Sequence, residues 1–284
     1  MMRVAAIQMR SGLTAQDNIP VLERLVGEAA ALGATYIQTP EMTGAMQRDR
    51  LVFAESLKLQ NDDLIVAAAS KLAKQLHVTL HIGSTAILCA DGKIANRALV
   101  FAPDGRLQTT YDKIHMFDVD LPNGESWRES ATYTPGIEAV MADVGEAKVG
   151  LAICYDLRFA ELFRIYAENG AHILSLPAAF TQQTGEAHWH VLLRARAIET
   201  GSFVVAAAQG GTHADGRQTF GHSMIIDPWG RILAEKNDAE PGVIIADLDL
   251  ALVADARARI PNLKNRRAIN LQSLTRQSEI RAAE

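Results

Sequence analysis

The sequence lacks the cysteine pattern of a disulfide framework or of a structural zinc site. Its 284 residues include two cysteines, Cys89 and Cys154, which do not form a Cys-x-x-Cys pair. Disulfide-stabilised domains and tetrahedral zinc sites need several cysteines or histidines at short spacings. We therefore expect neither, and a functional role for cysteine here would be that of a single thiol.

Long apolar runs and an excess of positive charge are also missing. No stretch of about 18 or more apolar residues occurs, and Met1–Gln8 has the pattern of a short strand rather than of a signal peptide. We therefore expect a soluble, cytoplasmic protein without a membrane partner. The formal net charge of −5 at pH 7 provides no long-range attraction for polyanions, so nucleic-acid binding is not expected.

Several motifs that would indicate a cofactor or another kind of hydrolase are absent. The sequence contains neither a Gly-x-x-x-x-Gly-Lys phosphate loop nor a Gly-x-Gly-x-x-Gly fingerprint. The segment Gly221–Ile225 lacks the final glycine of a serine-hydrolase elbow and is interpreted as the entry to a strand. His188-Trp189-His190 has a possible metal-binding spacing, but side chains two positions apart diverge on a helix. We expect no cofactor and no metal, and keep a metal hydrolase as an alternative.

The sequence does contain enough apolar residues for one large core. Hydrophobic residues make up 48% of the chain, so its length need not be divided between two domains. Asp91-Gly92 and Asp104-Gly105 are typical of tight hairpin turns. Short apolar segments alternate with helical stretches, which predicts an α/β fold with a mixed sheet. The predicted strands are Val4–Met9, Tyr36–Thr39, Thr79–Ser84, Ala98–Phe101, Val149–Ile153, His172–Leu176, Phe203–Ala208 and Met224–Ile226.

Helices and a long loop are predicted between these strands. Ile19–Leu32 and Asp63–Leu76 have helical periodicity, and Gly33 is a plausible cap of the first. The stretch from Leu121 to Gly136 shows no clear period and is interpreted as a surface loop. We assign residues 1–256 to one domain and 257–284 to a C-terminal extension. The arginine-rich extension either packs on a neighbouring subunit or is a solvated basic tail.

Cys154 lies where a strand pattern changes to a helical one. The apolar run from Val149 to Ile153 ends at Cys154, and helical spacing begins at Phe159. A thiol at such a corner is close to the backbone N–H groups of a helix start, which stabilise negative charge. A buried, unreactive strand cysteine is the other interpretation of this position.

Two further charged residues follow predicted strands. Glu41 comes directly after Tyr36–Pro40, and Lys113 follows the hairpin that contains Asp104-Gly105. A thiol nucleophile needs a base and a group that stabilises the oxyanion, and a carboxylate and a lysine can supply these functions. We also expect a lysine near the thiol to favour the thiolate. Either residue alone is weak evidence, because a charged residue after a strand is usually a solvated loop residue.

Taken together, the three contexts resemble the nitrilase-like carbon–nitrogen hydrolases. The shared features are Pro-Glu at Glu41, Tyr-x-Lys at Lys113 and Cys-Tyr-Asp-x-Arg-Phe at Cys154. The resemblance implies the four-layer α-β-β-α sandwich of that family. Two departures are Ala160, where the family usually has proline, and Gln38, for which the sequence offers no physical explanation.

The resemblance also implies a role for each residue. Cys154 would attack an amide carbonyl and form a thioester, while Glu41 would act as general base and acid. Lys113 and the backbone N–H of Tyr155 would bind the oxyanion, at roughly 3–4 kcal/mol per donor. Glu129 matches a second family glutamate that would orient the lysine and the substrate.

The resemblance implies that the substrate is a small-molecule amide. Residues 184–209 and Gly221–Gly230 resemble, within the family, the amidases that cleave deaminated glutathione to 2-oxoglutarate and cysteinylglycine. An ω-amidase or an N-carbamoyl amide hydrolase is the alternative within the same chemistry. A catalytically silent binding or scaffold protein with the same fold is the alternative from another class. Family resemblance further suggests a homodimer or a larger homo-oligomer.

An anionic substrate needs cationic anchors. Arg196 is also spaced for an ordinary helix pair with Glu199, and Arg158 for bracing the corner after Cys154. The candidate substrate-binding residues are Arg158, His188, Arg194, Arg196 and Arg217.

Overall fold

Two six-stranded sheets form the centre of the protein. The computed structural model describes residues 1–121 and 124–270. The first sheet has the order β16 (Gly242–Leu248), β1 (Met2–Gln8), β2 (Tyr36–Gln38), β3 (Thr79–Leu88), β4 (Ile94–Phe101), β5 (Leu107–Asp112). The second has the order β15 (Ile232–Glu235), β14 (Met224–Ile226), β11 (Phe203–Ala206), β10 (Ile173–Ser175), β9 (Ala147–Leu151), β8 (Met141–Val144). Two small hairpins are β6 (Asp118–Asp120) with β7 (Ser126–Arg128), and β12 (Gly210–Thr212) with β13 (Gln218–Phe220).

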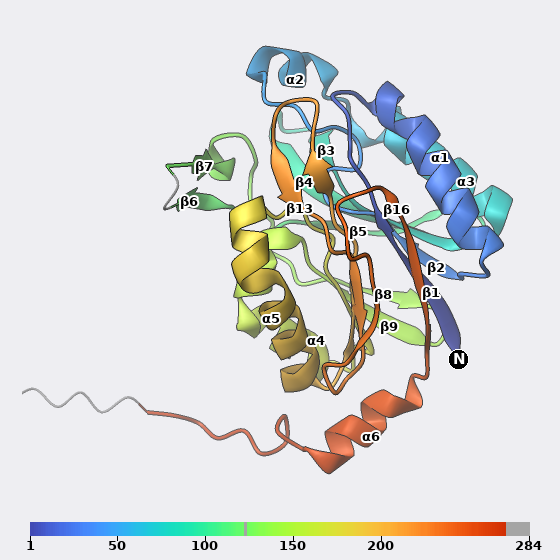
Figure 1. Cartoon of the computed structure of the whole chain (residues 1–284), viewed down its shortest axis with the longest axis vertical. Helices are drawn as coiled ribbons and strands as arrows, with labels where there is room; N and C mark the ends of the chain where they lie inside the picture. The colour runs from blue at the N-terminus through green and yellow to red at the C-terminus, as the bar shows by residue number, and fades with distance from the viewer. Residues whose placement is uncertain (122–123, 271–284) are drawn as a thin grey trace, which may run out of the picture.

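Helices cover the outer faces of the two sheets, as Figure 1 shows. On the first sheet lie α1 (Ala15–Ala31) and α3 (Leu64–Leu76), and on the second lie α4 (Ala160–Glu168) and α5 (Gln182–Thr200). The remaining helices are α2 (Arg50–Ser56), α6 (Ala251–Arg259) and the short 3₁₀ turns η1 (Gln60–Asp62), η2 (Glu129–Ala131) and η3 (Cys154–Arg158). The layers follow the order helix, sheet, sheet, helix, so the predicted four-layer sandwich is confirmed.

The central strands are buried on both faces, which explains their unbroken apolar sequences. In β1, Val4 and Ala6 contribute to the core between the sheets, while Ala5 and Ile7 contribute to the core beneath α1 and α3. Side chains alternate between the two faces of a strand. A strand covered on both sides therefore needs apolar residues at every position.

Each predicted strand is present, and several further strands were not predicted, namely β6, β7, β8, β12, β13, β15 and β16. Of these, β16 pairs antiparallel with β1, at the edge of the first sheet. The prediction of a surface loop without regular structure from Leu121 to Gly136 was wrong. This segment contains β7, which pairs with β6, and the turn η2; residues 122–123 lie outside the described residues.

Helix α1 begins at Ala15, four residues before the predicted start. The cause is a capping box, in which the Thr14 side chain accepts a hydrogen bond from the Asp17 N–H while the Asp17 carboxylate accepts one from the Thr14 N–H. Such a cap satisfies N–H groups that have no partner within the helix. The polar residues ahead of the apolar stripe are therefore helical.

Gly83 marks a very close approach between the segment before Glu41 and the second sheet. A Cβ atom at position 83 would lie 2.1 Å from the Thr39 carbonyl oxygen and 2.4 Å from the Cβ of Pro177. Both distances are below van der Waals contact. The absence of a side chain in β3 therefore sets the spacing between these two segments.

The described part of the C-terminal extension contacts its own chain. The Arg257 guanidinium donates to the carbonyls of Thr200 and Ala171 at 3.0 and 2.7 Å. The assigned boundary at 256/257 falls inside α6, and residues 271–284 lie outside the described residues. Packing on a neighbouring subunit stays a prediction.

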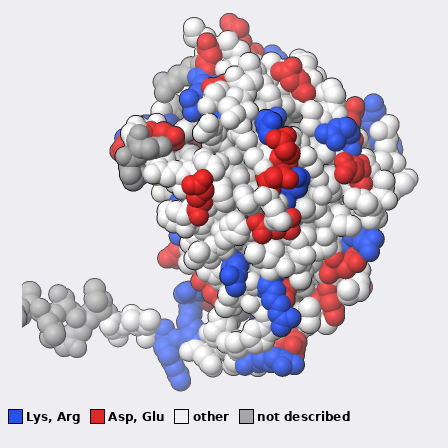
Figure 2. Space-filling model, in the orientation of Figure 1, with Lys and Arg blue, Asp and Glu red and all other residues white. Residues whose placement is uncertain are grey.

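On the face shown in Figure 2, acidic and basic side chains are interspersed over most of the surface. Among the helices of the described residues, none is both long and apolar enough to cross a membrane.

Candidate active site

Cys154 lies at a strained corner between β9 and η3. Its φ angle is +50°, in the left-handed region that residues other than glycine rarely adopt. Its backbone N–H donates to the Pro177 carbonyl at 2.9 Å. The predicted corner is confirmed, and it holds a buried thiol in a conformation that costs about 1–3 kcal/mol. Such strain persists only where the surrounding contacts fix the backbone.

Asp156 supplies those contacts. Its buried carboxylate accepts hydrogen bonds from the Ile153 N–H at 2.8 Å and from the Tyr111 hydroxyl at 2.7 Å. The backbone and the ring Nδ1 of His115 lie 3.0 and 2.7 Å from its other oxygen. Tyr111 and His115 flank Lys113 in the chain. One carboxylate therefore fixes the Cys154 turn and the Lys113 segment relative to each other.

Glu41 follows β2 and faces the same cavity as Cys154. One of its oxygens, Oε1, accepts hydrogen bonds from Lys113 Nζ at 2.9 Å and from Asn96 Nδ2 at 3.0 Å. The other, Oε2, accepts from the Ala179 N–H at 2.9 Å. Three hydrogen-bonding groups, contributed by segments of both sheets, thus place one carboxylate beside the thiol.

Lys113 is the centre of a buried charge cluster. Its Nζ donates to Glu41 and also lies 2.9 and 2.8 Å from the two oxygens of Glu129. The side chains of Lys113, Glu41 and Glu129 are 2%, 5% and 13% exposed. The Phe117 N–H donates to Glu129 at 2.7 Å. The four residues predicted from the sequence therefore converge, with Glu129 holding the lysine.

The electrostatics of the cluster keep Lys113 charged. Burial by itself lowers the pKa of Lys113, but the carboxylates of Glu129 and Glu41 outweigh it and raise that pKa well above its usual range. A lysine that stays protonated at every physiological pH can donate hydrogen bonds throughout a reaction cycle. It cannot itself serve as a base.

The thiol behaves differently from the sequence-based expectation. Burial and the Glu41 carboxylate raise the pKa of Cys154 well above its usual range, although Lys113 acts in the opposite direction. The predicted effect of the lysine is present but is outweighed, because desolvation penalises the thiolate. The free protein therefore holds a neutral thiol next to the Glu41 side chain. This arrangement suits proton transfer from Cys154 to Glu41 at the moment of attack.

Two residues of the site were missed as functional candidates. Asn96, in β4, donates through Nδ2 to Glu41 at 3.0 Å and to Glu129 at 3.1 Å, and so bridges the two carboxylates. Asp156 was noted only as part of the motif around Cys154. No local pattern distinguishes Asn96 from any other polar strand residue, whereas a buried acid beside a nucleophile is a detectable signal for Asp156.

The cluster opens into a cavity of about 370 Å³. Its walls contain the four clustered side chains, several aromatic rings and three arginines. These rings and arginines include Trp127, Tyr155, Phe180, Arg48, Arg128 and Arg217.

The predicted cationic anchors occupy different places. Arg217 lines the cavity. Arg158 does not, but its guanidinium carbon lies 5.9 and 5.7 Å from the centroids of Tyr155 and Phe180, which do. Its Nη2 is 3.3 Å from Nδ1 of His188. Arg158 and His188 therefore lie behind the side chains that line the cavity.

The other two arginines form hydrogen bonds with other groups of the chain. Arg194 donates to the Gly230 carbonyl at 2.8 Å. Arg196 is buried, donates to the Leu157 carbonyl at 2.8 Å and forms the expected pair with Glu199, also at 2.8 Å. Neither lines the cavity. Arg48, which was not a candidate, does, and its guanidinium carbon lies 5.3 Å from the Trp127 ring centroid, as does that of Arg217.

Sequence comparison agrees with this geometry. The profile of the family described as "Carbon-nitrogen hydrolase" matches residues 3–258. The chain belongs to the carbon–nitrogen hydrolase family. It is 38% identical over 270 residues to a protein of Synechocystis sp. named deaminated glutathione amidase, which covers 92% of this chain and 97% of that relative. It is 37% identical to the mouse protein named Omega-amidase NIT2, with 94% and 95% of the two chains covered.

Solved structures of this carbon–nitrogen hydrolase fold give the same result. The C. elegans NitFhit protein aligns with a TM-score of 0.87 at 32% identity, covering 94% of this chain. This chain spans 65% of the length of that protein. Saccharomyces cerevisiae Nit3, described as a member of the nitrilase superfamily, aligns with a TM-score of 0.81 at 27% identity, covering 92% of this chain and 94% of that one. The protein is an amide-hydrolysing enzyme of this family, and the interpretation as a silent scaffold is set aside.

Proposed function

We propose that this carbon–nitrogen hydrolase cleaves deaminated glutathione to 2-oxoglutarate and cysteinylglycine. The observation that carries the proposal is a single cavity that contains both the Glu41, Lys113 and Cys154 cluster and the cationic side chains of Arg48 and Arg217. Deaminated glutathione has a carboxylate at each end and an amide bond between them. The similarity to relatives named deaminated glutathione amidase supports the same substrate.

The first half of the reaction forms a thioester. Cys154 Sγ attacks the amide carbonyl while its proton passes to Glu41, which lies within the same hydrogen-bonded cluster. The carbonyl oxygen becomes an oxyanion that accepts hydrogen bonds from Lys113 Nζ and the backbone N–H of Tyr155. Glu41 then gives its proton to the departing amine. Cysteinylglycine leaves and the 2-oxoglutaryl group stays on the sulfur.

The second half returns the enzyme to its starting state. Glu41 accepts a proton from a water molecule, whose oxygen attacks the thioester carbonyl. The same two donors stabilise the second oxyanion, and the sulfur leaves and recovers a proton from Glu41. Glu129 acts throughout as a positioning residue, because its two oxygens hold Lys113 Nζ at 2.9 and 2.8 Å.

The cavity arginines differ in how much of their charge is already paired. Arg128 forms a two-bond ion pair with Asp120 at 2.9 and 3.0 Å, and Arg217 lies 3.0 Å from Asp215. Arg48 forms no ion pair among the described residues. We assign Arg48 and Arg217 to the glycine carboxylate of the cysteinylglycine half. Arg158, behind Tyr155, is the candidate for the 2-oxo acid end.

An ω-amidase is the second candidate function. Relatives named Omega-amidase NIT2 have nearly the same identity to this chain as those named deaminated glutathione amidase. Its substrate, 2-oxoglutaramate, has the same acyl half and releases ammonia instead of cysteinylglycine. The two functions thus share the acyl-enzyme and differ in the leaving group alone.

The shared acyl half makes a direct experiment possible. The purified enzyme is assayed for 2-oxoglutarate release from deaminated glutathione and from 2-oxoglutaramate, and the Cys154→Ala variant serves as the blank. Mass spectrometry then tests whether both substrates form the same 2-oxoglutaryl adduct. We expect kcat/KM to be at least roughly tenfold higher for deaminated glutathione. No product above the Cys154→Ala blank rejects the proposal, and a reversed preference favours the ω-amidase.

A matched variant tests the assignment of Arg48. Arg48→Gln removes the charge and keeps most of the side chain. We expect it to raise KM for deaminated glutathione and to leave KM for 2-oxoglutaramate unchanged, because that substrate has no glycine carboxylate. An equal change for both substrates contradicts the assignment.

A further inference from the structure

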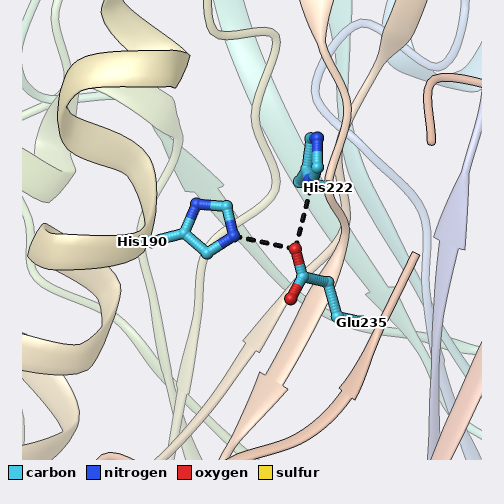
Figure 3. Close-up of side chains that lie close together, drawn as sticks. All are labelled: His190, His222 and Glu235. Carbon is cyan, nitrogen blue, oxygen red and sulfur yellow. Dashed lines mark hydrogen bonds and ion pairs between the residues drawn. The ribbon is translucent and has the colours of Figure 1, made fainter. Parts of the chain in front are cut away.

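Three potential metal ligands converge outside the active site. They are His190 of α5, His222 between β13 and β14, and Glu235 at the end of β15. Glu235 Oε1 lies 2.7 Å from His190 Nε2 and 2.8 Å from His222 Nδ1, and the three ligand atoms are within 4.8 Å of one another. Figure 3 shows both rings directed toward the carboxylate. We call these three residues the histidine cluster.

The two histidines are held in place by the fold. The indole N–H of Trp189, the neighbour of His190, donates to the His222 carbonyl at 2.8 Å. Trp189 is fully buried, so this bond ties the backbone of α5 to the loop that carries His222. The φ angle of His222 is +54°, in the left-handed region that residues other than glycine rarely adopt. The backbones that carry the rings are therefore fixed before any ligand arrives.

Aromatic packing fixes the orientation of the rings as well. His222 stacks on Phe220 with centroids 4.3 Å apart and planes 20° apart. His190 meets the edges of Phe220 at 6.0 Å and of His222 at 5.3 Å. A metal site needs such support, because outer contacts set which ring nitrogen faces the ion.

The cluster carries the charge that a cation needs and is open to solvent. Glu235 supplies a carboxylate, and a ring nitrogen of each histidine lies within hydrogen-bond distance of it. The side chains of His190, His222 and Glu235 are 35%, 24% and 18% exposed. An ion from solution can reach them without any opening of the fold.

We propose that His190, His222 and Glu235 form a binding site for a single divalent transition-metal ion, with zinc as the best match. Two imidazole nitrogens and one carboxylate oxygen are a donor set that zinc accepts, with water as the fourth ligand. On binding, the two hydrogen bonds to Oε1 are exchanged for bonds to the metal, and each ring proton moves to the other nitrogen of its imidazole. The carboxylate shifts outward, since ligands on zinc lie farther apart than hydrogen-bonded atoms.

The proposed ion is separate from the catalytic cluster. The site uses His190 rather than the His188-x-His190 pair considered from the sequence, because His188 points to Arg158. No step of amide hydrolysis involves the ion. Its role is to connect α5, β15 and the loop before β14.

Metal titration of the full-length chain tests the proposal. Zinc binding is measured by calorimetry in the Cys154→Ala background, which removes the active-site thiol as a competing ligand. Cobalt absorption reports the geometry and shows by the absence of a thiolate charge-transfer band that Cys89 is not a ligand. We expect one ion per chain and a tetrahedral visible spectrum.

Ligand variants and a matched control decide the location. Glu235→Gln keeps the shape of the side chain, and His222→Asn suits the left-handed backbone because asparagine tolerates it. Each should weaken zinc binding at least roughly tenfold. His77→Asn is the control, since His77 is an exposed histidine that also has a left-handed φ, +54°, and lies in no cluster. Equal affinity in all variants, or no zinc binding in the micromolar range, overturns the proposal.

Discussion

The catalytic cluster and the histidine cluster have opposite arrangements of acidic and basic side chains. In the first, the Lys113 cation lies between two carboxylates, and its side chain is 2% exposed. In the second, the Glu235 carboxylate lies between two imidazoles and is 18% exposed. Water can replace a missing partner in the second cluster and cannot in the first. We therefore expect burial, more than the number of hydrogen bonds, to determine how much stability is lost when one member of a cluster is removed.

The largest effect is expected from Lys113→Met. Removing the cation leaves the Glu41 and Glu129 carboxylates buried and close together, so the free energy of unfolding should fall by about 3–5 kcal/mol. Amide hydrolysis should fall by at least roughly 10²–10³-fold with the loss of one oxyanion donor. Denaturant unfolding and steady-state kinetics measure the two effects. Unchanged stability would show that the carboxylates are not held by the lysine.

A second prediction concerns the pKa of the thiol. Because the Glu41 carboxylate helps to raise the pKa of Cys154, Glu41→Gln should lower that pKa. Alkylation of Cys154 follows the thiolate fraction, so the midpoint of its pH profile should move to lower pH. Amide turnover should be lost at the same time, because the general base is gone.

The control for this experiment is Glu28→Gln, which removes an exposed carboxylate on α1. Its alkylation profile should coincide with that of the wild type. A midpoint that moves to higher pH in Glu41→Gln would contradict the electrostatic role assigned to Glu41.

A smaller effect is expected from Asn96→Ala. The amide of Asn96 donates to both Glu41 and Glu129, and its loss leaves the charges paired through Lys113. We expect a decrease in stability of about 1–3 kcal/mol, below that of Lys113→Met. Thermal unfolding measures it, and a loss as large as that of Lys113→Met would mean that the amide rather than the cation holds the carboxylates.

The smallest effect is expected at the histidine cluster. Glu235→Gln, measured without metal, should change the free energy of unfolding by about 1 kcal/mol or less, because partly exposed ion pairs contribute little. Denaturant unfolding in the presence of a chelator measures this. A decrease comparable to that of Lys113→Met would remove the contrast between the two clusters.

The sequence predicted the parts of the site that carry their own local signal. Cys154 was found because a strand pattern changes to a helical one at that residue, and Glu41 and Lys113 because charges follow strand patterns. Asn96 had no such signal, since its role arises only when the fold brings β4 close to Glu41 and Glu129. The pKa of the thiol was also not predictable, because it depends on how far burial outweighs a nearby lysine.

The fold shows the same division between local and long-range information. The four-layer arrangement followed from the resemblance, and the individual strands followed from their apolar runs. β16 contains an apolar run of the same kind, Val243–Ala246, and was overlooked, whereas its pairing with β1 at the other end of the chain has no local signal. The hairpin in the predicted loop was missed because its strands have three residues each.

A substitution at Gly83 would change the reaction rate without changing any reacting group. Gly83 lies between the Thr39 segment and the Pro177 segment. The first of these precedes Glu41, and the Pro177 carbonyl in the second accepts the hydrogen bond from the Cys154 N–H. Any side chain at position 83 would act as a wedge and push the base away from the nucleophile. Proton transfer is very sensitive to that gap, since the two groups must come within hydrogen-bond reach. A side chain at position 83 would therefore slow the reaction, although this residue takes no part in the chemistry.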